Sequence, residues 1–195
     1  SEVTTLTSST TYSIPETGWF QVIAIGAGGD GGTAAAVTGG GKWRYISSGG
    51  GGGSGGISAI KVAKKKNETI AISISNGDVS ISSLGISATA GDAGGAGQQN
   101  SAGTGGAGGT ATGGDMATQN GDTGSAGSRL ATSSWSNTTR AGGAGATNSY
   151  SGYTSSGGKG GDAELRYNGD VSATSPSTGS AAMVVILRGN TNKVA

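Results

Sequence analysis

The sequence predicts a mainly β fold with essentially no α-helix. Strands from both chain ends form a sheet or small sandwich, joined to a bundle of polyglycine II helices. Glycine contributes 43 of the 195 residues, roughly three times its average usage of about 7%. Leu130 is the only Leu, Ile, Val or Phe between residues 91 and 160, so large apolar side chains concentrate toward the ends. Glycine also recurs at every third residue through much of the chain.

The β prediction for the first half depends on apolar runs and their period. Residues 18–26 hold a dense apolar run, in which Trp19 is expected to be part of the core. Residues 69–75 alternate apolar and polar, and the Asn-Gly that follows them is typical of a hairpin turn. The remaining β signals are a second apolar run at 57–63, a continuation of the hairpin at 79–82, one or two short strands among the first 14 residues, a short segment at 86–89 and a buried type of strand at 182–188.

The glycine-rich segments have a period of three residues. The sets are Gly26, Gly29 and Gly32; Gly50, Gly53 and Gly56; Gly91, Gly94 and Gly97; Gly103, Gly106 and Gly109; Gly121, Gly124 and Gly127; Gly142 and Gly145; and Gly157 and Gly160. Three residues per turn is the geometry of polyproline II, which has no internal hydrogen bonds. A glycine at every third position clears one face, so that the backbone of a neighbouring helix can approach and pair. Collagen has the same period but needs abundant proline, and neither of the 2 prolines lies in these sets.

These patterns predict one glycine-rich domain over residues 1–195. Residues 1–90 are expected to be mostly β with two glycine-rich runs, 91–160 to form the polyglycine II bundle with loops, and 161–195 to supply closing β-strands. The alternative for the middle of the chain is a flexible Gly/Ser linker, but linkers lack so strict a period.

Composition argues against an enzyme. The chain has no His and no Cys, which removes the commonest general base, metal ligands and disulfides. Its net charge of +1 gives no basic surface for nucleic acid, and no apolar run approaches the length of a membrane span. We therefore expect no cofactor, no metal, no nucleic-acid partner and no membrane insertion.

Two glycine motifs resemble ligand sites without completing them. Residues 26–31 fit G-x-G-x-x-G after a strand, but no helix follows to carry a dinucleotide. Residues 157–162 nearly match a calcium-binding nonapeptide, but Glu164 stands where that repeat has an apolar residue, and the motif occurs once. Neither motif predicts a site.

Aromatic and arginine residues in the breaks between glycine sets are the candidate binding residues. They are Trp43, Arg44, Tyr45, Trp135, Arg140, Tyr150 and Tyr153. Such residues either fold back to cover the bundle or contact a partner, because Trp, Tyr and Arg dominate binding hot spots. Loops at the end of a rigid stack are a suitable place to present them.

The chain resembles the glycine-rich domains at the tips of bacteriophage tail fibres. The resemblance lies in a strand that ends in Gly26-Ala27-Gly28-Gly29, the glycine run 49–56 and the strand that begins Ile57-Ser58-Ala59. Polyglycine II segments interleaved with variable loops are similar to the distal adhesin of T-even-like long tail fibres. The resemblance implies a receptor-binding protein of the virion, extracellular, attached to the remainder of the fibre and binding a bacterial outer-membrane protein or surface polysaccharide through its loops.

Two other functions remain compatible with the sequence. An ice-binding protein uses a polyglycine II bundle to present flat faces of small residues, and thermal hysteresis would distinguish it. A structural or trimer-forming fibre segment is the second, and light scattering with a cell-binding assay would separate it from an adhesin.

Overall fold

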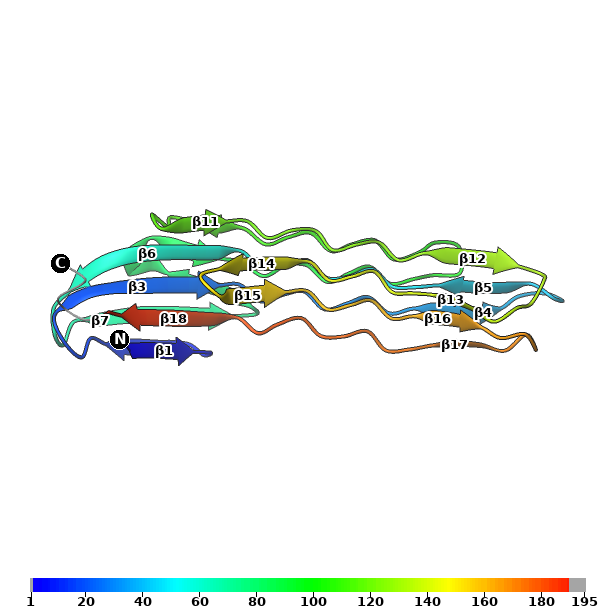
Figure 1. The fold of residues 1–195 in the computed structure, drawn as a ribbon, viewed down its shortest axis with the longest axis horizontal. Coiled ribbons are helices and arrows are strands. Elements are labelled where there is room, and N and C mark those ends of the chain that lie inside the picture. The colour runs from blue at the N-terminus through cyan, green and yellow to red at the C-terminus, as the bar shows by residue number, and fades with distance from the viewer. Residues whose placement is uncertain (1, 190–195) are drawn as a thin grey trace.

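The computed structural model describes residues 2–189 and is mainly β, as predicted. Within that range the one helical element is a 3-10 turn, η1 Ser82–Leu84. In chain order the strands are β1 Glu2–Leu6, β2 Thr10–Ser13, β3 Gly18–Ile25, β4 Ala35–Thr38, β5 Arg44–Ser47, β6 Ile57–Lys64, β7 Thr69–Ser75, β8 Asp78–Ile81, β9 Ile86–Ala88, β10 Ala111–Thr112, β11 Ala117–Gln119, β12 Arg129–Thr132, β13 Thr138–Arg140, β14 Thr147–Tyr150, β15 Tyr153–Ser156, β16 Ala163–Leu165, β17 Val171–Ala173 and β18 Met183–Arg188. The molecule is elongated, with sheets at both ends and nearly parallel threads between them (Figure 1).

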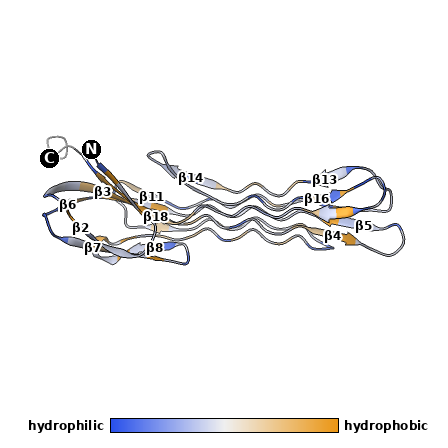
Figure 2. Cartoon of the chain, turned by 90° about the horizontal axis from the view of Figure 1, so that it is seen from below, coloured by the Kyte–Doolittle hydropathy of each residue, from blue (hydrophilic) through white to orange (hydrophobic). Residues whose placement is uncertain are grey.

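Two five-stranded antiparallel sheets form a sandwich at one end, which we call the sandwich end. One sheet has the order β1-β18-β3-β6-β11, and the other has the order β10-β9-β8-β7-β2. The core between them takes alternate residues of each strand, such as Phe20 and Val22 of β3 and Ile70 and Ile72 of β7. The strongly hydrophobic residues gather in sheets at the ends rather than along the threads (Figure 2).

The expectation that Trp19 belongs to the core is wrong. It is 36% exposed, because β3 directs Phe20, Val22 and Ala24 into the sandwich and leaves the odd-numbered residues on the other face. Part of that outer face is covered by the β14–β15 hairpin, but Trp19 lies beyond the residues that pack with the hairpin.

Extended threads connect the sandwich end to the opposite end, which we call the tip. The threads are residues 26–34, 48–56, 89–97, 102–110, 120–128, 141–146, 157–162 and 174–182. Their glycines all lie outside the positive-φ region, since every positive-φ glycine belongs to a turn. Hydrogen bonds between threads repeat every third residue: Gly26, Gly29 and Gly32 donate to the carbonyls of Gly56, Gly53 and Gly50. Both features fit a left-handed helix of three residues per turn.

Thread 48–56 is the centre of this bundle and is buried along its whole length. Its N–H groups donate in rotation to three neighbours: Ser48 to Ser128, Gly49 to Gly161 and Gly50 to Gly95. Its carbonyls accept from three other threads, through donors such as Gly32, Gly103 and Gly143. Six threads therefore surround it, and its peptide groups find partners although the thread lies far from water.

Glycine is required on this thread because no Cβ fits. A Cβ at Gly49, Gly52 or Gly55 would overlap a backbone carbonyl oxygen of thread 26–34, and the other glycines of the thread face further neighbours in the same way. The number of glycines per triplet follows the number of covered faces. Thread 48–56 is almost entirely glycine, whereas thread 120–128 uses Gly121, Gly124 and Gly127 alone. The glycines of the G-x-G-x-x-G motif are also packed against backbone carbonyl groups of neighbouring segments, so that a Cβ would not fit there.

The division of the chain into three parts is corrected by the structure. Threads come from all three parts, including 174–182, where only β-strands were expected, and β10 and β11 join the sandwich from within 91–160. Successive threads run alternately toward the tip and back, so the loops between them alternate between the two ends (Figure 1). This alternation decides which candidate residues lie together.

Candidate functional site

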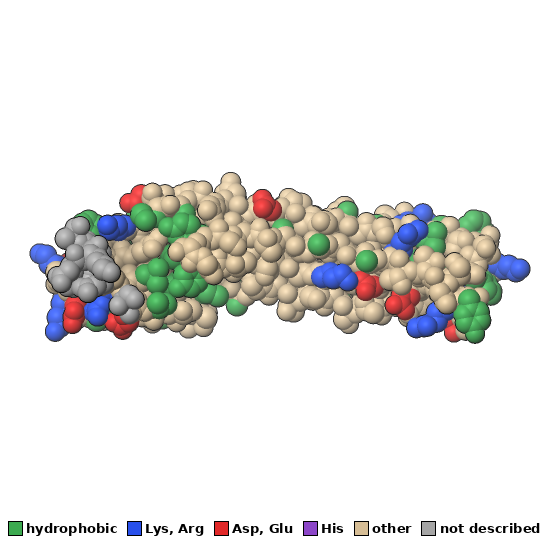
Figure 3. Space-filling view, in the orientation of Figure 1, with side chains coloured by type: hydrophobic (Ala, Val, Ile, Leu, Met, Phe, Trp, Pro, Cys, Tyr) green, Lys and Arg blue, Asp and Glu red, His purple; other side chains and the backbone are tan. Residues whose placement is uncertain are grey.

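The tip is built from two three-stranded sheets and the turns that join their strands. The orders are β12-β5-β4 and β13-β16-β17. A small core of Ile46, Ala163 and Leu165 holds the two sheets together. Hydrophobic and charged side chains gather toward the ends of the molecule, while much of the middle surface is backbone and small polar residues (Figure 3).

An aromatic ridge, defined here as Trp43, Tyr45 and Arg129, lies on the β12-β5-β4 sheet: Trp43 directly precedes β5, Tyr45 lies in β5, and Arg129 begins the neighbouring strand β12. The rings of Trp43 and Tyr45 are stacked, with centroids 6.3 Å apart and planes inclined by 17°. The Arg129 guanidinium lies 5.7 Å from the centroid of the Tyr45 ring, and its Nε donates to the Gln99 carbonyl at 2.9 Å. Trp43 is nevertheless 47% exposed. The ridge therefore presents the half-exposed Trp43 ring, stacked on a partly buried Tyr45 that lies near the Arg129 guanidinium.

The opposite face of β5 carries a structural contact between Arg44 and Trp135. The guanidinium lies 4.6 Å from the centroid of the Trp135 ring, and the Arg44 Nε donates to the Gly169 carbonyl at 2.7 Å. The Trp135 Nε1 donates to the Lys42 carbonyl at 2.8 Å, and Gly169 lies against the same ring. These two residues tie three turns together, so they support the tip more than they present a surface.

Arg140 lies in β13, where it pairs with Ala163. Its side chain is half-buried, and its Nε is among the few buried side-chain polar atoms of residues 2–189 without a hydrogen-bond partner. The tip therefore gathers five of the seven candidate residues: Trp43, Arg44, Tyr45, Trp135 and Arg140.

Tyr150 and Tyr153 lie at the other end of the molecule. They face each other at the end of the β14–β15 hairpin and pack on the outer face of the sandwich, against the cluster of Ile23, Ile25 and Val185. Gln21 Nε2 donates to the Tyr150 hydroxyl at 2.7 Å. These two tyrosines cover a sheet and do not belong to the site at the tip.

Tyr167 is a tip residue that the sequence reasoning missed. It is 73% exposed, the most exposed of the large hydrophobic side chains of residues 2–189. It lies in the β16–β17 turn, where its N–H donates to Asn137 Oδ1 at 3.0 Å. The signal was an aromatic residue directly before Asn168-Gly169-Asp170, since Asn-Gly marks a tight and exposed turn.

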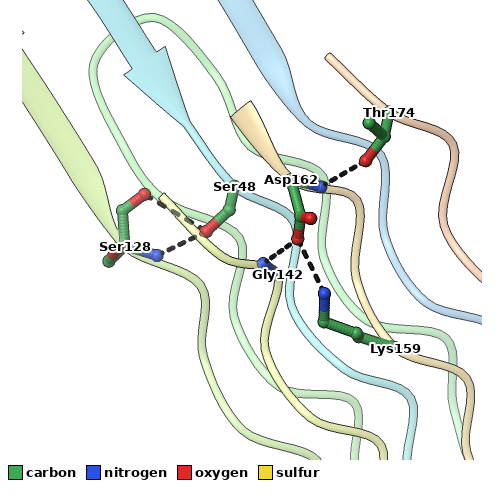
Figure 4. Close-up of polar contacts among 6 residues, drawn as sticks. All are labelled: Ser48, Ser128, Gly142, Lys159, Asp162 and Thr174. Carbon is green, nitrogen blue, oxygen red and sulfur yellow. Dashed lines mark hydrogen bonds and ion pairs between the residues drawn. The ribbon is translucent and has the colours of Figure 1, made fainter. Parts of the chain in front are cut away.

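Two separate sets of polar contacts join threads near the tip (Figure 4). Asp162 Oδ1 accepts from the Gly142 N–H and from Lys159 Nζ, both at 2.8 Å. The Gly142 hydrogen bond, and then Lys159, hold the pKa of Asp162 below its ordinary value of 3.8. Ser48 Oγ accepts from the Ser128 N–H at 2.7 Å, so a side chain completes the pairing where the thread begins.

Comparison of the chain with protein-family models and with curated proteins finds no match. Within residues 2–189 no helix has the length and apolar character needed to cross a membrane, and no three acidic, His or Cys side chains cluster as a metal site would require.

Proposed function

We propose that this chain is a receptor-binding adhesin at the tip of a bacteriophage tail fibre. In this proposal the tip of the bundle contacts a bacterial surface protein or polysaccharide, and the protein acts by binding rather than by catalysis. The observation that carries the proposal is the aromatic ridge: a Trp left 47% exposed and stacked on a Tyr at the end of a stiff bundle. Preorganised aromatic side chains are the usual energetic centre of a recognition surface.

The two ends of the molecule fit the two tasks of such a protein. Glu2 of β1 pairs with Arg188 of β18, so the first and last strands lie side by side in the sandwich. Any further chain joined to either terminus, such as the remainder of a fibre, would attach there and leave the tip free. The irregular aromatic ridge favours adhesion over ice binding, which requires a flat face of small residues.

The proposal predicts different effects for two exposed tryptophans. Trp43→Ala should weaken binding of labelled protein to susceptible bacterial cells by about 30-fold or more, because truncating a hot-spot residue costs about 2 kcal/mol or more. Its melting temperature should stay close to that of the wild type, since the removed ring is half exposed. The measurement is cell-bound fluorescence as a function of protein concentration, over a panel of Gram-negative strains.

Trp19→Ala is the matched control, because it removes a similarly exposed ring at the opposite end of the molecule. It should leave cell binding unchanged. Equal binding by Trp43→Ala and the wild type, or equal losses in the two variants, would contradict the proposal.

A further inference from the structure

A polar groove lies on the tip beside strand β13, separate from the aromatic ridge. It has a volume of about 330 Å³, toward the lower end of the range of small-ligand sites, which is about 300–1,000 Å³. Its lining residues are Asn137, Thr138, Thr139, Glu164, Leu165 and Arg166. Leu165 is 2% exposed and belongs to the small core between the tip sheets, and the other lining residues carry an amide, hydroxyls, a carboxylate and a guanidinium.

The groove is held in shape by hydrogen bonds of backbone N–H groups, to a side chain and to backbone carbonyls. Asn137 Oδ1 accepts from the Tyr167 N–H, which fixes the two walls to each other. The Arg166 N–H donates to the Asp170 carbonyl, and the Gly169 N–H donates back to the Arg166 carbonyl, both at 2.9 Å. A preformed site avoids much of the entropy cost of ordering side chains and loops on binding.

The charged pair in the groove has capacity left for a ligand. Glu164 Oε2 and Arg166 Nη2 are 3.6 Å apart, with side chains 34% and 62% exposed. That separation is longer than a good charged hydrogen bond. Thr139 lies directly opposite Glu164 in the β13–β16 register. The groove therefore offers both donors and acceptors while its two opposite charges cancel, which suits a neutral ligand with many hydroxyl groups better than a phosphate or another ion.

The composition of the groove argues against a side chain of a protein partner as its ligand. Hot-spot pockets in protein interfaces bury aromatic or aliphatic side chains in apolar surroundings, and here the one apolar lining residue is the buried Leu165. The residue after Arg166 is the exposed Tyr167, whose N–H is hydrogen-bonded to the lining residue Asn137. We infer that the groove binds a neutral sugar unit of a bacterial surface glycan. This inference rests on the proposed function and narrows its receptor to a polysaccharide.

The test is a titration of the intact protein with D-glucose, D-galactose and N-acetyl-D-glucosamine. The NMR signals of the backbone amides are recorded at each sugar concentration. At least one of the sugars should shift the amides of 137–139 and 164–167 with a dissociation constant in the millimolar range, which corresponds to about −4 kcal/mol. Glu164→Gln and Arg166→Gln should each lower the affinity for that sugar by about tenfold, which is the loss expected for one hydrogen bond to a charged group. Glu16→Gln, a carboxylate at the sandwich end that is 61% exposed, is the matched control and should not change the affinity.

The outcomes separate this inference from the proposed function. If no sugar shifts the groove amides at about 100 mM, well above a millimolar dissociation constant, while the protein still binds cells through Trp43, the glycan inference is overturned and the adhesin proposal stands. If a sugar binds in the groove while the protein binds no cell strain, the groove assignment holds and the adhesin proposal fails. Shifts that Glu16→Gln weakens as much as the groove variants would also overturn the inference.

Discussion

At the scale of single residues, the bundle depends on positions where one hydrogen atom is the largest side chain that fits. Gly52 is such a position, because its missing Cβ leaves room for the Gly29 carbonyl of the adjacent thread. A few serines also occupy tightly packed positions of the bundle, and their hydrogen bonds show why they fit. Ser54 Oγ accepts from the Asp122 N–H at 2.8 Å, and Ser155 Oγ accepts from the Gly55 N–H and donates to the Gly26 carbonyl. A serine is tolerated in these places because its oxygen replaces a backbone partner.

Gly52→Ala should destabilise the protein by about 3 kcal/mol or more, because the new methyl group overlaps backbone that has no room to move. For a chain of this size that loss lowers the melting temperature by about 6–12 °C. Thermal unfolding followed by circular dichroism measures the effect. Gly40→Ala is the control: Gly40 is exposed, has no positive φ and has nothing within 4 Å of a Cβ. Equal melting temperatures for the two variants would contradict the packing described for the central thread.

The lowered pKa of Asp162 predicts that the stability of the protein depends on pH. The folded-state pKa of this carboxyl is lowered, chiefly by the Gly142 N–H and then by Lys159, so its ionised form stabilises the fold. That stabilisation is present above the ordinary pKa of 3.8 and is lost as pH falls through the lower folded-state pKa. The wild type should therefore melt above Asp162→Asn at pH 6, and the gap should narrow as the pH falls below about 4. A gap that stays constant down to pH 2 would show that the charge contributes nothing.

At the scale of elements, sequence periods predict the strands and threads well, because each period has one physical cause. Alternation at 69–75 matches β7, Thr69–Ser75, and the following Asn-Gly makes the predicted turn to β8. Triplet glycines identify most of the threads. Thread 174–182 escaped prediction because Gly179 is its one glycine. A thread at the edge of the bundle has few covered faces, so the period that reveals the inner threads is weak there.

The structure brings five of the seven candidate residues together, and the separation of the other two has a geometric cause. Each thread carries the chain from one end to the other, so loops alternate between tip and sandwich. Counting threads puts the loop at 35–47 at the tip and the hairpin at 147–156 at the sandwich end. Residue type alone groups Tyr150 with Trp43, whereas the number of threads between them places the two residues at opposite ends. The position of Trp19 also follows from counting along the chain. Residues two apart on a strand share a face, so the polar Gln21 indicates that Trp19 lies on the outer face of β3.

Trp135 should affect stability where Trp43 affects binding. Trp135→Ala removes the ring between Arg44 and Gly169 and the hydrogen bond to the Lys42 carbonyl. We expect a loss of about 2–3 kcal/mol, somewhat below the cost of truncating a fully buried aromatic residue. Chemical unfolding of Trp135→Ala and Trp43→Ala, side by side, measures the difference. A similar stability for the two variants would mean that the turns of the tip do not depend on the Arg44–Trp135 contact.

At the scale of the whole molecule, the threads turn a chain with few large apolar residues into a stiff rod with two different ends. The sandwich supplies the conventional hydrophobic core, and its strands lead directly into threads: β3 into 26–34, and thread 48–56 into β6. The bundle then holds the aromatic ridge and the polar groove at a fixed distance from the sandwich. Rigidity of the glycine-rich middle is what the proposed role in recognition requires, because a flexible linker would not preorganise a binding surface.

Hydrogen exchange at the amides of residues 49–56, measured by NMR, tests that rigidity most directly. Each of these N–H groups is hydrogen-bonded and buried at the centre of the bundle, so exchange should require global unfolding and be as slow as in β3 of the sandwich core. Exchange of these amides at the fast rate of an unstructured glycine-rich segment, while β3 stays protected, would contradict the bundle and the presentation of the tip that depends on it.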